Sequence, residues 1–331
     1  MTNLINNPQS QVAREQVRIA VTRSSSSAFI PLIVTGALLL LVGIVVPQMG
    51  DYALEVGFRL LLLLTVAEAW NLMAGYGGMV SLGTAAFFGA GAYSMTGLVN
   101  LLGVPPWIAI PLSGLTGAGL CLVVSKGVFR LRGLYFTVGT LALAEALRLF
   151  MVNYGGFGGA SGIVLSQDPP GLRTLFLMAI VLVTVTMVVM NVATRSRFSV
   201  LLRAVRDDED SASQLGVRTF RVKLIAFVLA GALTSIAGAL QALKLGTVEP
   251  YGTFGLQWTI SALSIVIIGG QGLRAGPVLG TIFVVVLGEA LADWPALQLA
   301  LTGVILMGVI RFAPQGIAGL IESTLGRKGK S

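Results

Sequence analysis

The sequence predicts an all-α integral membrane protein, a polytopic bundle of about 10 (8–10) transmembrane helices with cytoplasmic N and C termini. Of the 331 residues, 55% are apolar and only 11% are charged, and the mean hydropathy is +0.87. A soluble domain carries about 25% charged residues, which keep its surface wet. This chain lacks such a surface, so lipid is its expected environment. The composition also excludes the disordered, collagen-like and disulfide-framework classes.

Ten apolar stretches with at most two charged residues each follow one another along the chain. Each is close to the about 20 residues that a helix needs to cross a bilayer. They cover residues 29–46, 58–75, 79–101, 105–125, 133–152, 173–193, 223–244, 256–273, 277–293 and 295–312.

The positions of Lys and Arg set the orientation of these spans. With both termini inside, 18 of the 22 basic residues lie on the cytoplasmic side. Only Arg59, Arg148, Arg173 and Lys244 fall at or near the outer side. Cytoplasmic loops carry an excess of basic residues, so this distribution favours an even number of spans.

The expected organisation is a cytoplasmic tail at 1–28, a transmembrane domain at 29–312 with a cytoplasmic loop at 194–222, and a second cytoplasmic tail at 313–331. The first 28 residues are too long and too polar for the basic start of a cleaved signal peptide, so we expect them to be retained.

Eight crossings are the main alternative to ten. The closely spaced stretches at 58–101 or 256–293 could include a re-entrant or broken helix instead of complete crossings. The sequence GYGG at 75–78 can break a helix at membrane depth. Irregular backbone is tolerated there only where protein buries it or where it lines a polar cavity.

Glycines recur at helical spacing inside several spans. They include Gly83 to Gly91, Gly114 to Gly119, and the pair Gly231 and Gly238. Small residues let two helix backbones approach closely, so packing seams are the favoured interpretation.

The residues that are missing exclude several kinds of chemistry. The chain has no His and a single Cys, Cys121, which lies within an apolar run. Zinc sites, His-based acid–base catalysis and intrachain disulfides are therefore excluded, and we expect no metal site. No GxxxxGK[ST] phosphate loop occurs, so the chain is not expected to bind ATP by that route. The net charge of +8 suits cytoplasmic loops better than nucleic acid, and we expect no nucleic-acid partner.

The cytoplasmic loop between the sixth and seventh predicted spans is the strongest local signal. Eleven of the 36 charges lie between Arg195 and Lys223. Apolar side chains at three- and four-residue spacing predict a short amphipathic helix. These side chains are Phe198, Leu201, Leu202 and Val205. We expect a rigid knob, closed by a glycine turn at Gly216, that transmits force from a cytoplasmic partner. A solvated connector is the alternative.

The chain resembles the LivM family, the permease subunit of high-affinity branched-chain amino acid ABC importers, over nearly everything after residue 55. The resemblance rests on GYGGMVSLGTAAFFGAGAY (75–93), RLRGLYFTVGTLALAEALRLF (130–150), GGASGI (158–163), SRFSVLLRAVRDDEDSASQLGVRTFRVKLIAFVLAGALTSIAGAL (196–240), VIIGGQGLRAGPVLGT (266–281) and FAPQGIAGLIE (312–322).

The resemblance implies a transporter subunit of the bacterial inner membrane and not an enzyme. No cofactor would be bound by this chain, because two separate ABC ATPase subunits would hydrolyse the ATP. The other implied partners are a homologous LivH-like permease subunit, a periplasmic or lipid-anchored amino acid-binding protein and membrane lipid. The binding protein would dock on the outer loops at 153–172 and 246–255, and transport would proceed by alternating access.

The resemblance also places an ATPase-docking coupling helix on about Ser199 to Gly216. The sequence Asp210-Ser211-Ala212-xxx-Gly216 looks like a relaxed EAA-xxx-G loop of import permeases. The residues expected to couple to the ATPase are Ser199, Leu202, Arg203, Arg206, Asp207, Asp210, Ala212 and Gly216.

Ionisable and polar residues within the spans are candidates for the translocation path. A charge near the bilayer centre costs at least about 2.5 kcal/mol, so it should face protein or a wet cavity. The candidates are Glu68, Asn71, Ser81, Thr84, Tyr93, Glu145 and Glu289. For Glu145, pairing with Arg148 three residues away is the favoured structural alternative. For Glu68 neither role is preferred.

Three other functions compete with a branched-chain amino acid importer. A urea or short-amide permease would look like the same family. A stand-alone secondary transporter would need ion-coupling carboxylates and an inverted repeat, and no strong repeat is visible. A membrane enzyme has almost no support, because no nucleophile has a paired base.

Overall fold

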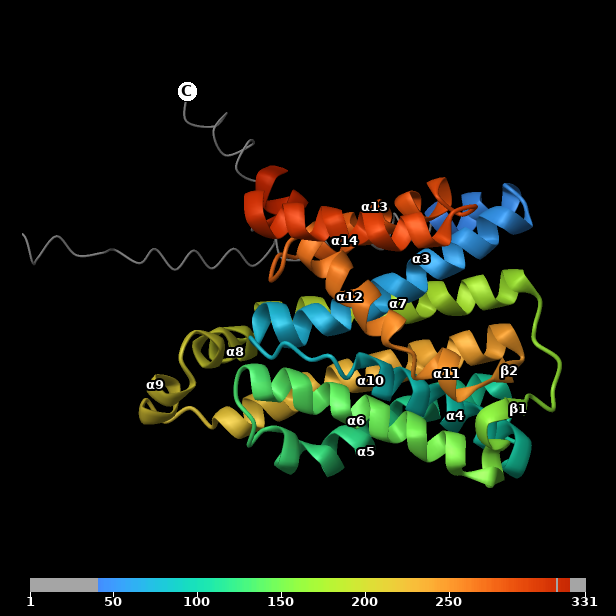
Figure 1. Cartoon of the computed structure of the whole chain (residues 1–331), viewed down its shortest axis with the longest axis horizontal. Coiled ribbons are helices and arrows are strands. Elements are labelled where there is room, and N and C mark those ends of the chain that lie inside the picture. The colour runs from blue at the N-terminus through green and yellow to red at the C-terminus, as the bar shows by residue number, and fades with distance from the viewer. Residues whose placement is uncertain (1–40, 314, 322–331) are drawn as a thin grey trace, which may run out of the picture.

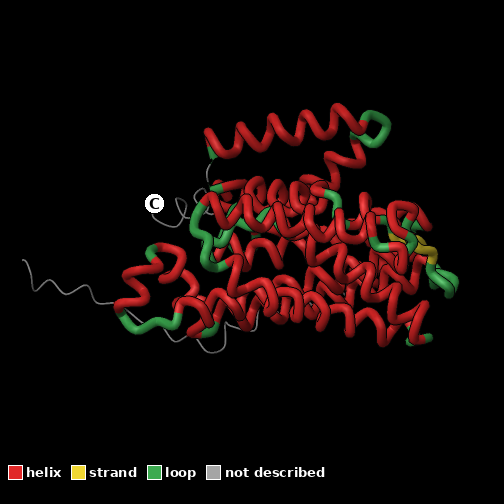
Figure 2. Tube along the Cα trace, turned by 60° about the horizontal axis from the view of Figure 1, so that its bottom comes forward, coloured by secondary structure: helices red, strands yellow, loops and turns green. Residues whose placement is uncertain are grey.

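A computed structural model of the chain describes residues 41–313 and 315–321. Helices make up almost the whole trace, and the two short strands lie together at one end (Figure 2). The expected all-α polytopic architecture is confirmed. The predicted tail at 1–28 and most of the first span at 29–46 lie outside the described residues.

Long apolar helices dominate the described part of the chain. They are α3 (Asp51–Trp70), which continues as the π-helix η2 (Asn71–Tyr76), α4 (Thr84–Leu102), α5 (Pro106–Val128), α6 (Leu134–Asn153), α7 (Leu172–Arg195), α10 (Thr219–Leu245), α12 (Leu256–Gly269), α13 (Gly276–Ala290) and α14 (Pro295–Phe312). The other elements are η1 (Val46–Gln48), η3 (Gly155–Phe157), η4 (Gly159–Ser161), β1 (Ile163–Val164), α8 (Arg197–Asp207), α9 (Glu209–Gln214), β2 (Thr247–Val248) and α11 (Pro250–Thr253).

The nine apolar stretches predicted after the first each fall on one of these helices. In the described residues, seven helical segments are long and apolar enough to cross a membrane, the last formed by α11 and α12 together. The apolar helices α13 and α14 are shorter. The predicted stretches at 256–273 and 277–293 both extend past their helices, which end at Gly269 and Ala290.

The two ends of the bundle carry different structures (Figure 1). Helices α8 and α9 lie at one end, and β1, β2 and α11 at the other. Strands β1 and β2 pair antiparallel, with Ile163 opposite Val248, which joins the two loops predicted to face outward. Asn100, near the end of α4, bonds the backbone at Val164 and Ser166. The loop at 194–222 therefore lies opposite the predicted outer loops.

Helix α10 is the centre of the packing, in contact with α3, α4, α5 and α7. Glycines make these contacts close. A Cβ at Gly91 of α4 would overlap the backbone of Ser235 in α10, and a Cβ at Gly238 would overlap the backbone of Phe88. The packing role proposed for the glycines is confirmed at Gly91 and Gly238, and it is wrong for Gly119, around which there is open space.

The helix beginning at Asp51 is broken near its far end. At Asn71 the α-helix widens into a π-helix, which ends at Tyr76. The chain then runs without helical structure until α4 begins at Thr84, so the prediction of one continuous helix over 79–101 is wrong for residues 79–83. The break expected at GYGG is confirmed.

Side chains of α3 and α6 form hydrogen bonds with the backbone of this irregular segment inside the bundle. The indole N–H of Trp70 donates to the carbonyl of Ser81 at 2.9 Å, and the hydroxyl of Thr137 donates to that of Val80 at 2.8 Å. The Thr140 hydroxyl accepts the N–H of Leu82 at 3.0 Å. These bonds satisfy backbone groups that lipid could not.

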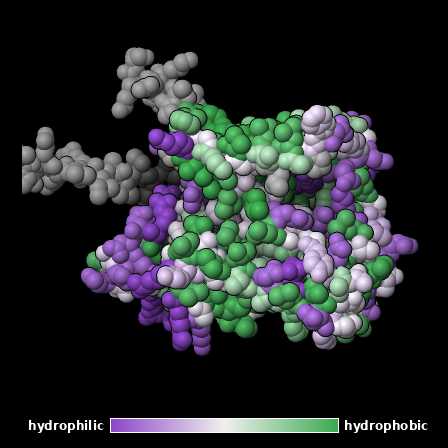
Figure 3. All heavy atoms as spheres, viewed as in Figure 1, coloured by the Kyte–Doolittle hydropathy of each residue, from purple (hydrophilic) through white to green (hydrophobic). Residues whose placement is uncertain are grey.

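The surface changes character along the bundle (Figure 3). Hydrophobic side chains cover much of its middle, and hydrophilic side chains gather at the end where α8 and α9 lie. On α5, exposed large side chains such as Trp107, Leu115, Leu122 and Val123 are apolar, as lipid contact requires.

Candidate functional site

The predicted cytoplasmic knob consists of two helices. Helix α8 ends at Asp207, and α9 begins at Glu209. Asp208 between them has an extended backbone (φ −157°), and its carboxylate accepts the N–H groups of Asp210 and Ser211 at 2.9 and 3.1 Å. This N-cap starts a new helix, so the single helix expected here is replaced by an α8–α9 corner. Gly216, with φ +86°, follows α9 as predicted.

One face of the corner packs on the transmembrane helices. Leu202, Val205 and Ala212 are nearly fully buried, in a cluster with Tyr76 and Phe227. They fix the position of the corner, and their side chains are not available to a cytoplasmic partner.

The opposite face is open. Its exposed side chains include those of Val200, Asp207, Asp210 and Leu215, with Leu215 86% exposed, and Ser199 is half-buried. Arg203 is exposed as well, and its guanidinium lies 5.6 Å from the ring centre of Tyr76. We define these exposed residues together with Gly216 as the outer face of the corner. It combines apolar and charged side chains, as a protein-docking surface does.

Arg206 connects the corner to the helix break. Its guanidinium Nη1 donates to the carbonyl of Gly75 in the π-helix at 2.8 Å, and its Nε contacts Asp207 at 3.2 Å. The neighbouring carbonyl, that of Ala74, accepts from the amide of Gln271 at 3.0 Å. The broken end of α3 is thus held by the corner and by the α12–α13 turn.

Asn71 also joins the broken end of α3 to the α12–α13 turn. Its side-chain oxygen accepts the N–H of Gly272 at 2.9 Å, and its amide donates to the carbonyl of Leu273 at 3.3 Å. Asn71 is completely buried. The structure therefore places this path candidate in a helix–turn junction.

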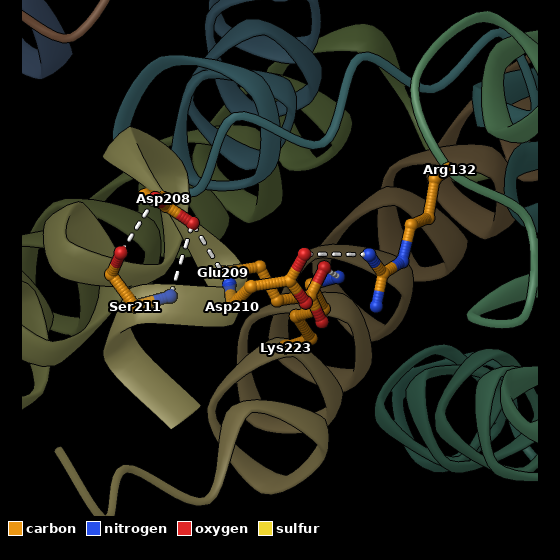
Figure 4. A network of polar contacts seen from close by, with 6 residues as sticks. All are labelled: Arg132, Asp208, Glu209, Asp210, Ser211 and Lys223. Carbon is orange, nitrogen blue, oxygen red and sulfur yellow. Dashed lines mark hydrogen bonds and ion pairs between the residues drawn. The ribbon is translucent and has the colours of Figure 1, made fainter. Parts of the chain in front are cut away.

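A polar network fixes α9 to its neighbours (Figure 4). Arg132, from the α5–α6 turn, pairs with Asp210 at 3.0 Å, and Lys223 of α10 pairs with Glu209. The Asp210 carboxylate raises the pKa of Arg132 by hydrogen bonding and by its charge. Hydrogen bonds from Ser211 lower the pKa of Asp208. The Asp208 carboxylate is therefore held in its charged form.

The path candidates do not come together at one place. Ser81 lies in the irregular segment, where its hydroxyl accepts the N–H of Gly83. Thr84 and Tyr93, both on α4, are buried, and their hydroxyl oxygens have no hydrogen-bond partner in the described structure. Glu289 accepts from Tyr52 at 2.7 Å and from Arg59 at 3.1 Å, between α13 and the start of α3.

Glu145 and Arg148 form the expected pair on α6. Arg148 Nε donates to Glu145 at 2.9 Å, and its guanidinium stacks 4.9 Å from the ring centre of Tyr251. The Glu145 side chain is 52% exposed. The pair borders a groove of about 280 Å³ between α6 and the 251–256 segment.

Glu68 lies in a different cavity, of about 360 Å³, between α3, α7 and the start of α13. The residue is only 3% exposed, and no hydrogen bond or ion pair of its carboxylate is found within residues 41–313 and 315–321. The cavity is lined by Glu68, Tyr76, Met187, Met190, Asn191, Thr194, Arg274, Ala275, Val278 and Leu279.

Sequence reasoning missed several residues at these sites. Gln271 and Tyr251 follow glycines or proline at the ends of spans, where a polar or aromatic side chain has many possible roles. Trp70, Thr137 and Thr140 look like ordinary residues of an apolar helix. Their function depends on the irregular segment beside them, which no local pattern reveals.

Comparison with known proteins points to the same family as the resemblance in the sequence. Residues 52–310 match the family described as "Branched-chain amino acid transport system / permease component". The LivM permease proteins of Salmonella typhimurium and Escherichia coli, named for high-affinity branched-chain amino acid transport, are each 28% identical over 286 residues, 77% of this chain and 67% of theirs. The D-allose permease protein AlsC of Escherichia coli is 24% identical over 197 residues, 59% of each chain. No solved structure matches the chain.

Proposed function

This chain belongs to the family of permease components of branched-chain amino acid transport systems, and on that premise we propose that it is the membrane-spanning subunit of an ABC importer for branched-chain or related hydrophobic amino acids. ATP would be hydrolysed by two separate ATPase subunits on the cytoplasmic side of a bacterial inner membrane. Alternating access would move the amino acid inward.

The observation that carries this proposal is the α8–α9 corner. It lies at the end opposite the paired loops of β1 and β2, and its inner face is packed onto the bundle. Its Arg206 binds the carbonyl of Gly75 at the end of the broken helix. A push on the outer face would thus act directly on α3, the helix that contains the break. This is what coupling to a cytoplasmic ATPase requires.

A second permease subunit would cover α6. This helix is the least buried of the seven candidate spans, and it carries the exposed Glu145 paired with the partly buried Arg148. Charged side chains in a transmembrane helix do not face lipid, because the hydrocarbon cannot solvate them. We therefore assign the α6 surface to the interface with a homologous permease, with the Glu145–Arg148 groove on the shared path.

The outer end would receive the binding protein. The loops at 153–172 and 246–255 are joined there by the β1–β2 pairing, which gives one continuous surface in place of two separate loops. Val164 and Tyr251 are exposed on it.

ATP-dependent uptake tests the proposal. The chain is reconstituted in liposomes with its genetic neighbours, namely the second permease, the ATPases and the binding protein, and uptake of labelled leucine and of labelled urea is measured. Leucine uptake that requires ATP and all subunits supports the proposal. Preferential urea uptake would reassign the substrate, and leucine uptake by this chain alone would make it a secondary transporter.

A further inference from the structure

The cavity around Glu68 has a composition that the transport path does not explain. It is separate from the α6 groove, because its walls come from α3, α7 and the start of α13. Its volume of about 360 Å³ lies in the range of about 300–1,000 Å³ typical of small-molecule sites. We propose that this cavity binds a zwitterionic amino acid with an apolar side chain, taken up from the cytoplasm.

A cation would complement the Glu68 carboxylate in this cavity. The Glu68 side chain is buried and has no partner in the described structure. An ionisable group buried within a membrane span is costly and by default marks a functional site. An ammonium group is the complement that a carboxylate in a small cavity accepts.

An anion is favoured beside Arg274. Arg274 lines the same cavity and is exposed. Ala275 and Val278, at the N-terminal turn of α13, lie beside it. A guanidinium and a helix N-terminus both attract a carboxylate.

The remaining walls are apolar. Met187, Met190, Val278 and Leu279 also line the cavity, and methionine side chains adapt to apolar groups of different shapes. A carboxylate, a guanidinium and apolar walls in one cavity match the ammonium group, the carboxylate and the side chain of an aliphatic α-amino acid. The choice of an amino acid as the zwitterion rests on the proposed function.

The cavity extends toward the end of the bundle where the α8–α9 corner lies. Tyr76, at the broken end of α3, lines it, and so does Thr194 near the end of α7 that leads into α8. A ligand there would contact the elements that Arg206 and Gln271 hold together at the break. Binding of a cytoplasmic amino acid at this place would make the conformation of the broken end of α3 depend on the concentration of transported product.

Binding is measured by calorimetry on the full chain in lipid nanodiscs without ATP or other subunits, with L-leucine, leucinamide and N-acetylleucine as probes. Leucine should bind, and the two analogues, each lacking one charge, should bind about tenfold more weakly, a factor that corresponds to about 1.4 kcal/mol. Glu68→Gln and Arg274→Gln should each weaken leucine binding by a similar factor.

Glu55→Gln is the matched control, because Glu55 lies on the same helix but pairs with Lys244 outside the cavity. It should bind leucine as the parent does. Removing the buried charge should leave the melting temperature of Glu68→Gln at least as high as that of the parent, which separates loss of binding from loss of fold.

Equal leucine binding by Glu68→Gln and the parent would overturn the inference, as would no leucine binding by the parent. A phosphatidylethanolamine molecule that remains bound to the purified parent and is lost from Glu68→Gln would assign the cavity to lipid and also overturn it. ATP-driven import can succeed while this binding fails, or fail while it succeeds, so the two proposals are tested separately.

Discussion

Arg206 forms a direct hydrogen bond between the α8–α9 corner and the broken end of α3. Its partner is a backbone carbonyl of a π-helix, a helix form that often marks functional sites. Because the bond is made to the backbone, it requires only that the end of α3 stay in its present shape. A change in that shape and a movement of α8 are therefore linked.

Arg206→Ala should uncouple ATP hydrolysis from transport. Its side chain is partly exposed, so the lost hydrogen bond is worth about 1 kcal/mol, below the range of a fully buried charged bond. Leucine transported per ATP hydrolysed should fall severalfold in liposomes. Arg197→Ala, which removes an exposed Arg of the same helix, should leave this ratio unchanged. Equal effects of the two variants would contradict the role of Arg206.

Asp208 gives the corner a pH dependence. Because Ser211 lowers its pKa, the cap is fully formed above the ordinary Asp pKa of about 3.9 and is lost as the pH falls through the lower folded value. A spin label on Leu215→Cys should be more mobile at pH 7 in the Asp208→Ala background. The unmodified corner should reach that mobility only in acid below about pH 4. Identical mobility at pH 7 would show that the cap does not order α9.

At the scale of elements, the sequence predicts the helices well and their interruptions poorly. Hydropathy locates nine described helices because a membrane span must be apolar whatever it packs against. It cannot show that residues 79–83 are not helical, because the groups that satisfy their backbone, Trp70, Thr137 and Thr140, lie on other segments.

For the candidate site residues, too, the sequence predicts what local periodicity determines and misses what packing determines. The amphipathic spacing from Phe198 to Val205 predicts the buried face of α8, since local periodicity determines which face is apolar. The path candidates could not be sorted in this way. Arg148 three residues away indicates the partner of Glu145, but Asn71 and Glu68 have similar surroundings in the sequence, and only the packing puts them in a junction and a cavity.

Helix packing around α10 depends on glycine. Gly91→Ala would force apart α4 and α10, because the new methyl group meets the backbone of Ser235, and we expect a loss of about 1–3 kcal/mol of stability. Gly119→Ala on α5, with open space around it, should be neutral or stabilising by up to about 1 kcal/mol. Thermal unfolding in detergent compares them. A Gly91→Ala variant as stable as Gly119→Ala would argue against close packing here.

At the scale of the whole molecule, the exposed surfaces of α5 and α6 differ in polarity. The surface of α5 exposes large apolar side chains, whereas α6 exposes Glu145 beside apolar residues. The first suits lipid, and the second suits protein or water. A partner subunit is therefore expected to assemble on the α6 surface and not on the α5 surface.

Spin labels on Val138→Cys and Val123→Cys test this direction. Val138 lies two turns before Glu145 on α6, and Val123 is an exposed residue of α5. Addition of the second permease should reduce the oxygen accessibility of the α6 label and leave that of the α5 label unchanged. Reduced oxygen accessibility of the Val123 label alone would place the partner on α5 and contradict the assignment to α6.

The most direct measurement of the central claim is the reaction of Leu215→Cys with a membrane-impermeant maleimide. Leu215 is 86% exposed on the outer face of the corner, and the native Cys121 is buried. Leu215→Cys should react only when the cytoplasmic side is opened, and bound ATPase subunits should slow the reaction severalfold. Val164→Cys on β1 should react from outside and be unaffected by the ATPases. Labelling of Leu215→Cys in intact cells, or equal rates with and without the ATPases, would contradict the account.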